Sequence, residues 1–234
     1  MIKSLLQKTL LGMVLFGLSG ALEAQAGSVT LSSTFQGGES VQVKYTGQNS
    51  WQSTTAGAFT ETPISPGGSA FNAYCVSLNI SVGNGPDTIH ATTTSPLSSV
   101  TNASPYFANS GYSDVGNRLA YLLTQFSATT ADQKSAMALA IWDTIDSKFM
   151  YRYATTSIDN LYNQYTSFSN YNSHTAYGGT NATLFVVNAN DHYQNLISLT
   201  SYGSVPEPAS IVSAVVGLAG MGLVGLRRRR KAVA

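Results

Sequence analysis

The residues of this chain best suited to covalent chemistry are its single cysteine, Cys75, and its three histidines. A cysteine hydrolase needs a histidine within hydrogen-bond reach of the thiol. His90 is the best placed, because a short return strand over 88–92 would lie near Cys75. Cys75 sits in an apolar stretch, however, and such surroundings raise the pKa of a thiol and weaken it as a nucleophile. We therefore predict that the chain is not an enzyme, with a secreted cysteine hydrolase as a distant alternative.

The acidic residues give weaker signals. Asp191 and His192 are adjacent but have no third ligand in their neighbourhood, so we predict no metal site and no cofactor. Asp143 and Asp146 share one face of a predicted helix, whereas glycosidase carboxylates face each other across a cleft. We expect these two carboxylates to lie on an exposed helical face.

Cys75 belongs to a segment, 71–82, whose side chains alternate as they would on a buried strand. The face with the thiol would carry Phe71, Ala73, Cys75 and Ser77. The opposite face would carry Tyr74, Val76, Leu78 and Ile80. We expect 88–92 to return beside this strand.

Further strands are predicted on both sides of a helical middle. Residues 28–45 favour two strands joined by a tight turn at 36–39, and further strands are indicated at 58–62, 183–187 and 195–199.

Between these strands the spacing of apolar residues lengthens to that of helices. Helices are predicted at 114–126, from Thr130 onward and at 157–165. Thr130 and Gln133 have the spacing of a capping box. The order of strands, helices and strands predicts an α+β fold: a β-rich single domain with a central helical insertion.

The first 26 residues are typical of a secretory signal peptide. Lys3 and Lys8 precede an apolar stretch over 10–18, and Ala24-Gln25-Ala26 supplies small residues for cleavage by signal peptidase. An uncleaved anchor is the alternative, for which the apolar stretch is short. The mature domain would then span 27–204.

The last 30 residues join a short polar motif to a membrane-length segment. The motif is Val205-Pro206-Glu207-Pro208, and the apolar run 209–226 would span about 27 Å as a transmembrane helix. Five cations follow and favour a cytoplasmic end: Arg227, Arg228, Arg229, Arg230 and Lys231.

This tail resembles the PEP-CTERM sorting signal of Gram-negative bacteria, from Val205 to Lys231. The resemblance implies processing by an exosortase in the inner membrane, only transient residence in that membrane, and export to the cell surface or extracellular matrix. A plain C-terminal membrane anchor is the alternative.

Removing both targeting segments changes the charge of the domain. Residues 27–204 hold five lysines and arginines against nine aspartates and glutamates, a net charge of about −4. Nucleic-acid binding needs a basic face, so we exclude it.

The domain is rich in Ser, Thr, Asn, Gly and Tyr. Such tyrosines offer apolar area with a hydroxyl and suit surfaces that stack on sugars, although a structural role is the commoner one for any single ring.

Two short motifs, Tyr74-Cys75-Val76 and Leu139-Ala140-Ile141-Trp142, resemble those of the thioester domains of bacterial surface proteins. The resemblance covers 71–146. It implies a cysteine strand followed by a helix with Gln-x-Ala-Ile-Trp, in which the thiolate displaces ammonia from the glutamine. Here Ala138 stands in place of that glutamine, so a degenerate domain without the bond is implied. A thioester to a displaced Gln125 or Gln133 stays open, although Gln133 would point elsewhere on the helix.

The two resemblances together imply a structural or adhesive role in exopolysaccharide or biofilm. The main alternative is a covalent adhesin with a working internal thioester.

Overall fold

The computed structural model describes residues 27–65, 67–78, 87–188 and 193–200. The signal peptide predicted at 1–26 and the sorting tail predicted at 205–231 lie outside these ranges. Within them, no helix has the length and apolar character needed to cross a membrane.

In the described part of the chain, seven strands form one sheet in the order β2-β3-β7-β6-β4-β1-β5, and β2 also pairs with β1. Six of the strands therefore close into a ring, with β5 attached outside it at the end of β1. The strands are β1 (Gly27–Lys44), β2 (Gln52–Ser65), β3 (Phe71–Cys75), β4 (Asp87–Thr94), β5 (Met150–Arg152), β6 (Ala182–Val187) and β7 (Leu196–Leu199). All their pairings are antiparallel.

The predicted tight turn at 36–39 is wrong, because β1 runs through it as one long strand. The register against β2 shifts between Phe35 and Gly38, which is a β-bulge. Gly37 has a φ of +82°, and a Cβ on Gly38 would meet the carbonyl oxygen of Ala56 at 1.8 Å. A bulge and a tight turn both favour glycine at these positions. The sequence alone therefore predicted a turn between two strands, whereas pairing with β2 makes the segment a bulge within one strand.

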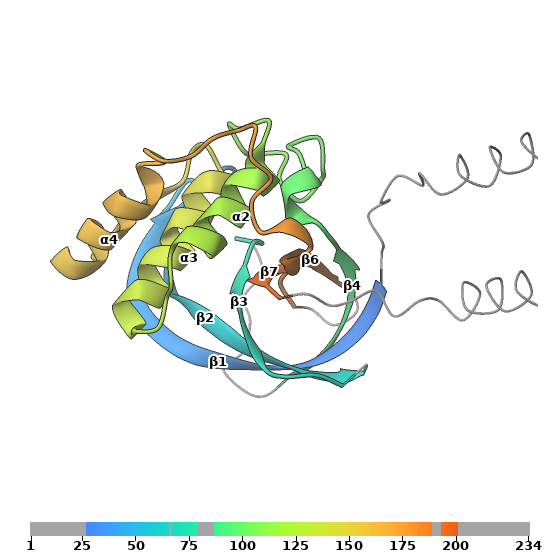
Figure 1. Ribbon diagram of the computed structural model, residues 1–234. Helices are drawn as coiled ribbons and strands as arrows, with labels where there is room; N and C mark the ends of the chain where they lie inside the picture. Colours follow the sequence, from blue (N-terminus) through green and yellow to red (C-terminus); the bar gives the residue numbers. More distant parts are fainter. Residues whose placement is uncertain (1–26, 66, 79–86, 189–192, 201–234) are drawn as a thin grey trace, which may run out of the picture.

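Three helices lie between β4 and β6: α2 (Val115–Gln125), α3 (Ala131–Ile145) and α4 (Thr156–Thr166). The predicted capping box at the start of α3 is confirmed, with Thr130 and Gln133 bonding reciprocally. Short 3-10 helices, η1 (Leu97–Ser99) and η2 (Gly179–Asn181), flank this insertion. In Figure 1 the helices gather on one side of the molecule, while β3, β4, β6 and β7 complete the ring on the other.

The buried side chains form two clusters on opposite faces of the sheet. One fills the ring and includes Leu31, Cys75, Ile89 and Phe185. The other lies between the sheet and the helices. The alternation predicted for 71–82 is confirmed around Cys75, since Ala73 and Cys75 face the ring interior while Tyr74 and Val76 face the helices. The predicted strand is too long, because β3 ends at Cys75.

Two predicted features of the sheet need correction. β4 does not pair with the cysteine strand; it pairs with β1 and β6, while β3 pairs with β2 and β7. The strand β5 was not predicted, because its three residues have no pattern of their own and pair only with the end of β1. The β-rich domain with a central helical insertion is as predicted.

Candidate functional site

The cysteine strand and helix α3 meet through one hydrogen bond. The indole Nε1 of Trp142 donates to the backbone carbonyl oxygen of Cys75 at 3.0 Å. Both side chains are buried, Cys75 in the ring and Trp142 in the layer beneath the helices. The two residues of the paired motifs are therefore adjacent, but the contact uses the backbone of Cys75 and not its thiol.

Ala138 lies on α3, buried in the helix-facing cluster. The thiol of Cys75 belongs to the ring cluster, on the other face of β3. The helix that would carry the acyl donor and the thiol that would accept it thus lie on opposite sides of one strand.

The two displaced glutamines are also placed away from the thiol. The Gln133 side-chain oxygen accepts bonds from the amides of Thr129 and Thr130 in the capping box. Gln125 is exposed at the end of α2, whereas Cys75 is 5% exposed. Neither carboxamide is available to form a thioester in this conformation.

A buried carboxyl group, which the sequence analysis missed, lies inside the ring near the thiol. Ser33 Oγ donates to Glu61 Oε1 at 2.6 Å and contacts the hydroxyl of Tyr193 at 2.6 Å. Glu61 Oε2 is buried with no hydrogen-bond partner. Burial raises the pKa of Glu61 to about 7, only partly offset by the bond from Ser33. The alternation of β2 could have revealed Glu61, because it follows the inward-facing Phe59 by two residues.

The thiol itself is in surroundings that suppress nucleophilic chemistry. Burial, and secondarily the nearby Glu61 carboxyl group, raises the pKa of Cys75 well above its ordinary value. His90 is exposed on β4, whose inward-facing residues are Ile89 and Ala91. The histidine considered as a general base therefore lies on the face of β4 away from the ring interior.

The predicted acidic pair is not on an exposed face. Asp146 is 2% exposed at the end of α3, where its carboxylate accepts bonds from the Thr46 amide and hydroxyl and from the Lys148 amide. Asp143 is half-buried, and burial raises the pKa of its carboxyl. The prediction failed because the loop after β1 packs on the helix end. Asp191 and His192 lie outside the described residues, among which no group of three or more potential ligands could hold a metal.

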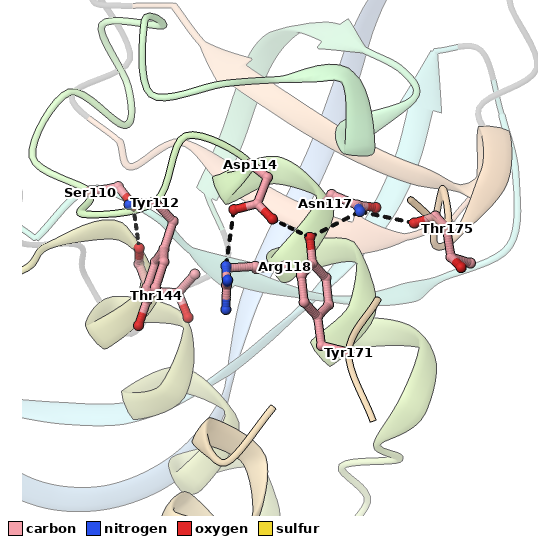
Figure 2. Close-up of polar contacts among 8 residues, drawn as sticks. All are labelled: Ser110, Tyr112, Asp114, Asn117, Arg118, Thr144, Tyr171 and Thr175. Atoms are coloured by element: carbon pink, nitrogen blue, oxygen red, sulfur yellow. Dashed lines mark hydrogen bonds and ion pairs between the residues drawn. The ribbon is translucent and has the colours of Figure 1, made fainter. Parts of the chain in front are cut away.

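A polar network fastens the loop after α4 to the start of α2 (Figure 2). Asp114 accepts from Arg118 Nε at 3.0 Å and from the Tyr171 hydroxyl at 2.6 Å, and Asn117 donates to that hydroxyl and to the Thr175 carbonyl. Burial alone would raise the pKa of Asp114, but the bonds from Tyr171 and Arg118 together hold it below its ordinary value. The carboxylate and the cation satisfy each other, so the network is structural.

Comparison with known proteins gives one family match and one structural neighbour. Residues 204–231 match the PEP-CTERM protein-sorting motif. No curated protein matches the chain. A solved structure, the N-terminal thioester domain of a surface protein from Clostridium perfringens, aligns over 73% of this chain and 98% of that chain, with a TM-score of 0.49 and 10% identity.

Proposed function

We propose that this chain is a structural or adhesive protein of the cell surface or extracellular matrix, working in exopolysaccharide or biofilm. The observation that carries the proposal is the PEP-CTERM motif at 204–231, which implies sorting by exosortase to the surface or the extracellular space. After transient membrane residence, the domain over 27–204 would be the part that acts outside. Signal peptidase would remove the N-terminal segment.

A non-enzymatic role is supported by the surroundings of the one thiol. A cysteine nucleophile works as the thiolate and needs an adjacent base. Cys75 has a raised pKa, and His90 lies on the other face of its strand. We therefore take Cys75 as a core residue, in keeping with the usual behaviour of free cysteine as a small buried hydrophobe.

The same geometry argues against the covalent adhesin. Position 138 offers no carboxamide, and Gln133 is engaged in the cap of α3. The side of β3 that carries the thiol is not the side that packs on the helices. The adhesive role that we propose is accordingly non-covalent.

The sorting step is tested by replacing Pro206, Glu207 and Pro208 with alanine. We expect this variant to stay in the membrane with its tail, whereas the unaltered protein is found outside the cell with a new C-terminus near the motif. The matched control replaces 201–203, just outside the matched region, and should be processed normally. Mass spectrometry of the C-terminus in exosortase-positive and exosortase-null cells gives the answer. Normal release of the triple variant would refute exosortase processing.

The matrix role is tested separately by fractionating the producing cells. The processed protein should extract together with polysaccharide and should be lost from the matrix in cells that make no polysaccharide. A protein that is processed normally but found free in the medium of both strains would refute the matrix role while leaving the sorting step intact.

A further inference from the structure

One face of the three neighbouring strands β2, β1 and β5 is partly exposed: Ser53 and Arg152 are exposed, and Gln42 between them is half-buried. Ser53, Gln42 and Arg152 form a row across these strands, in register. Gln42 Oε1 accepts from Arg152 Nε at 2.9 Å and Nη2 at 2.6 Å, and Gln42 Nε2 donates to Ser53 Oγ at 3.3 Å. The opposite face of β1 carries the buried Val41 and Val43. The row is therefore ordered by its own bonds although it faces water.

Two aromatic rings flank this row. The guanidinium carbon of Arg152 lies 4.4 Å from the centre of the Trp51 ring and 4.8 Å from that of Tyr153. Tyr153 is 70% exposed. Tryptophan, tyrosine and arginine dominate the hot spots of binding surfaces. The rigid rings of tryptophan and tyrosine give large contact area at little entropic cost.

The backbone at Tyr153 is strained. Its φ is +67°, in the left-handed region that a bulky side chain rarely adopts. No hydrophobic burial repays this strain, since the ring points to solvent. Strained backbone of this kind collects at functional sites, where the direction of the side chain matters.

The face also holds two cations that pair with no carboxylate among the described residues. Lys44 follows Gln42 by two residues on β1 and pairs in register with Met150, so it shares the face with Arg152. Neither cation forms an ion pair within the described ranges, in contrast to Arg118, which is paired with Asp114. Gln42 occupies two of the five N–H donors of Arg152, which leaves three for a ligand.

Charge narrows the class of ligand. Residues 27–204 carry only five lysines and arginines, and two of them meet on this face of a domain with a net charge of about −4. An acidic polymer would be repelled by most of the surface and attracted here. Two cations are too few for a nucleic-acid track, whereas rings that present flat apolar area beside a hydroxyl or an indole N–H suit pyranose rings.

We propose that this face, formed by Trp51, Lys44, Arg152 and Tyr153, binds a segment of acidic polysaccharide. Uronate carboxylates bind Lys44 and the free donors of Arg152, and the sugar rings stack on Trp51 and Tyr153. This inference rests on the proposed function, because the face would supply the non-covalent attachment of the domain to its matrix.

The experiment measures binding of the full chain, purified in detergent and immobilised, to four soluble probes. Alginate is the polyuronate, dextran the neutral polysaccharide, polyglutamate the acidic polypeptide and single-stranded DNA the nucleic acid. We expect alginate to bind best, with affinity falling as salt rises. Equal binding of dextran, or equal or better binding of polyglutamate or DNA, would overturn the assignment to acidic polysaccharide, as would failure of alginate to bind.

Variants connect the binding to this face. Lys44→Gln combined with Arg152→Gln should weaken alginate binding at least about tenfold and remove most of its salt dependence. Trp51→Ala should weaken it by a similar factor at unchanged salt dependence. The matched controls are Lys134→Gln on α3 and Tyr106→Ala, a cation and an exposed ring elsewhere, and both should bind as the unaltered chain does. If Lys134→Gln weakened alginate binding as much as the double cation variant, or Tyr106→Ala as much as Trp51→Ala, the assignment of the site would be wrong.

Tyr153→Gly separates binding from folding. Glycine adopts a positive φ readily, so the change should leave the thermal midpoint equal or higher while it weakens alginate binding at least about fivefold. A lower midpoint with unchanged binding would mean that the tyrosine is structural and would overturn its role.

The two proposals can fail separately. If a correctly sorted protein fails to bind alginate, only this inference is contradicted. If the protein binds alginate but is not sorted outward, only the proposed function is contradicted.

Discussion

The indole of Trp142 and the backbone carbonyl of Cys75 are joined by a 3.0 Å hydrogen bond across the boundary between α3 and the sheet. The bond fixes the helix against the strand while the thiol points the other way, into the ring. This geometry keeps the two motif residues adjacent in a chain whose helix has no glutamine at 138. The contact between the two motif residues is one of packing and backbone hydrogen bonding.

Replacing Trp142 with phenylalanine should therefore destabilise the domain. The carbonyl of Cys75 would lose its indole donor in a buried place, and an unsatisfied buried acceptor costs about 1–3 kcal/mol. The urea dependence of unfolding measures the loss. Trp51→Phe is the matched control, because Trp51 precedes β2 and is only half-buried, so its replacement should change the free energy of unfolding by less. Equal effects of the two changes would contradict the importance of the bond.

The thiol of Cys75 should be inert in the folded protein. Burial raises its pKa, and reaction with a thiol reagent requires the ring to open. We expect labelling in water to be at least about a hundredfold slower than labelling in denaturant. The intact mass should equal that of the unmodified chain and stay unchanged after methylamine treatment. A mass lower by one ammonia, restored by a methylamine adduct, would instead demonstrate an internal thioester.

Glu61 should make the protein less stable as the pH rises. Burial raises its pKa from an ordinary 4.5 to about 7, so the folded state holds a proton that the unfolded state has released. Its contribution is complete below pH 4.5 and is lost as the pH rises through about 7. The total is about 3 kcal/mol, taking about 1.4 kcal/mol for each pH unit.

Glu61→Gln tests this dependence because glutamine keeps the shape and cannot ionise. Unfolding midpoints in urea, measured across this pH range, should fall for the unaltered protein and stay nearly level for the variant. Glu39→Gln, a half-buried glutamate on β1, should retain the slope of the unaltered protein. A variant with the same slope as the unaltered protein would assign the pH dependence to another group.

Local signals in the sequence were sufficient for most elements of the fold. The alternation around Cys75 predicted both faces of β3, and the spacing of Thr130 and Gln133 predicted the start of α3. Pairings were not predictable in this way, because β4 finds its neighbours through the closure of the ring. The bulge at Gly37 shows the same limit: glycine permits the positive φ, and pairing with β2 makes the segment a bulge within one strand rather than a turn.

For the candidate sites too, the sequence marks individual residues but not how they lie relative to one another. The two short motifs made Cys75 and Trp142 candidate site residues, but only the layers of the fold reveal that the thiol faces away from α3. Arg152 and Trp51 are about a hundred residues apart in the sequence. They meet because β5 adds to the end of β1, so no local pattern marks the face that they form.

The hydroxyl of Tyr171 should hold the loop over 168–177 against α2. In Tyr171→Phe, Asp114 loses a 2.6 Å bond and Asn117 loses one acceptor, at an expected cost of about 1–2 kcal/mol. The effect should be local, because Asn117 Oδ1 also accepts from the amide of Tyr177. Hydrogen exchange at that amide should accelerate, while exchange at the Gln133 amide, in the cap of α3, should not. Tyr106→Phe, on an exposed tyrosine, is the matched control and should leave both rates unchanged. If the Tyr177 amide were equally protected in Tyr171→Phe, the aromatic packing of Tyr121 against Tyr177 at 4.9 Å would be what holds the loop, and the polar network would be secondary to it.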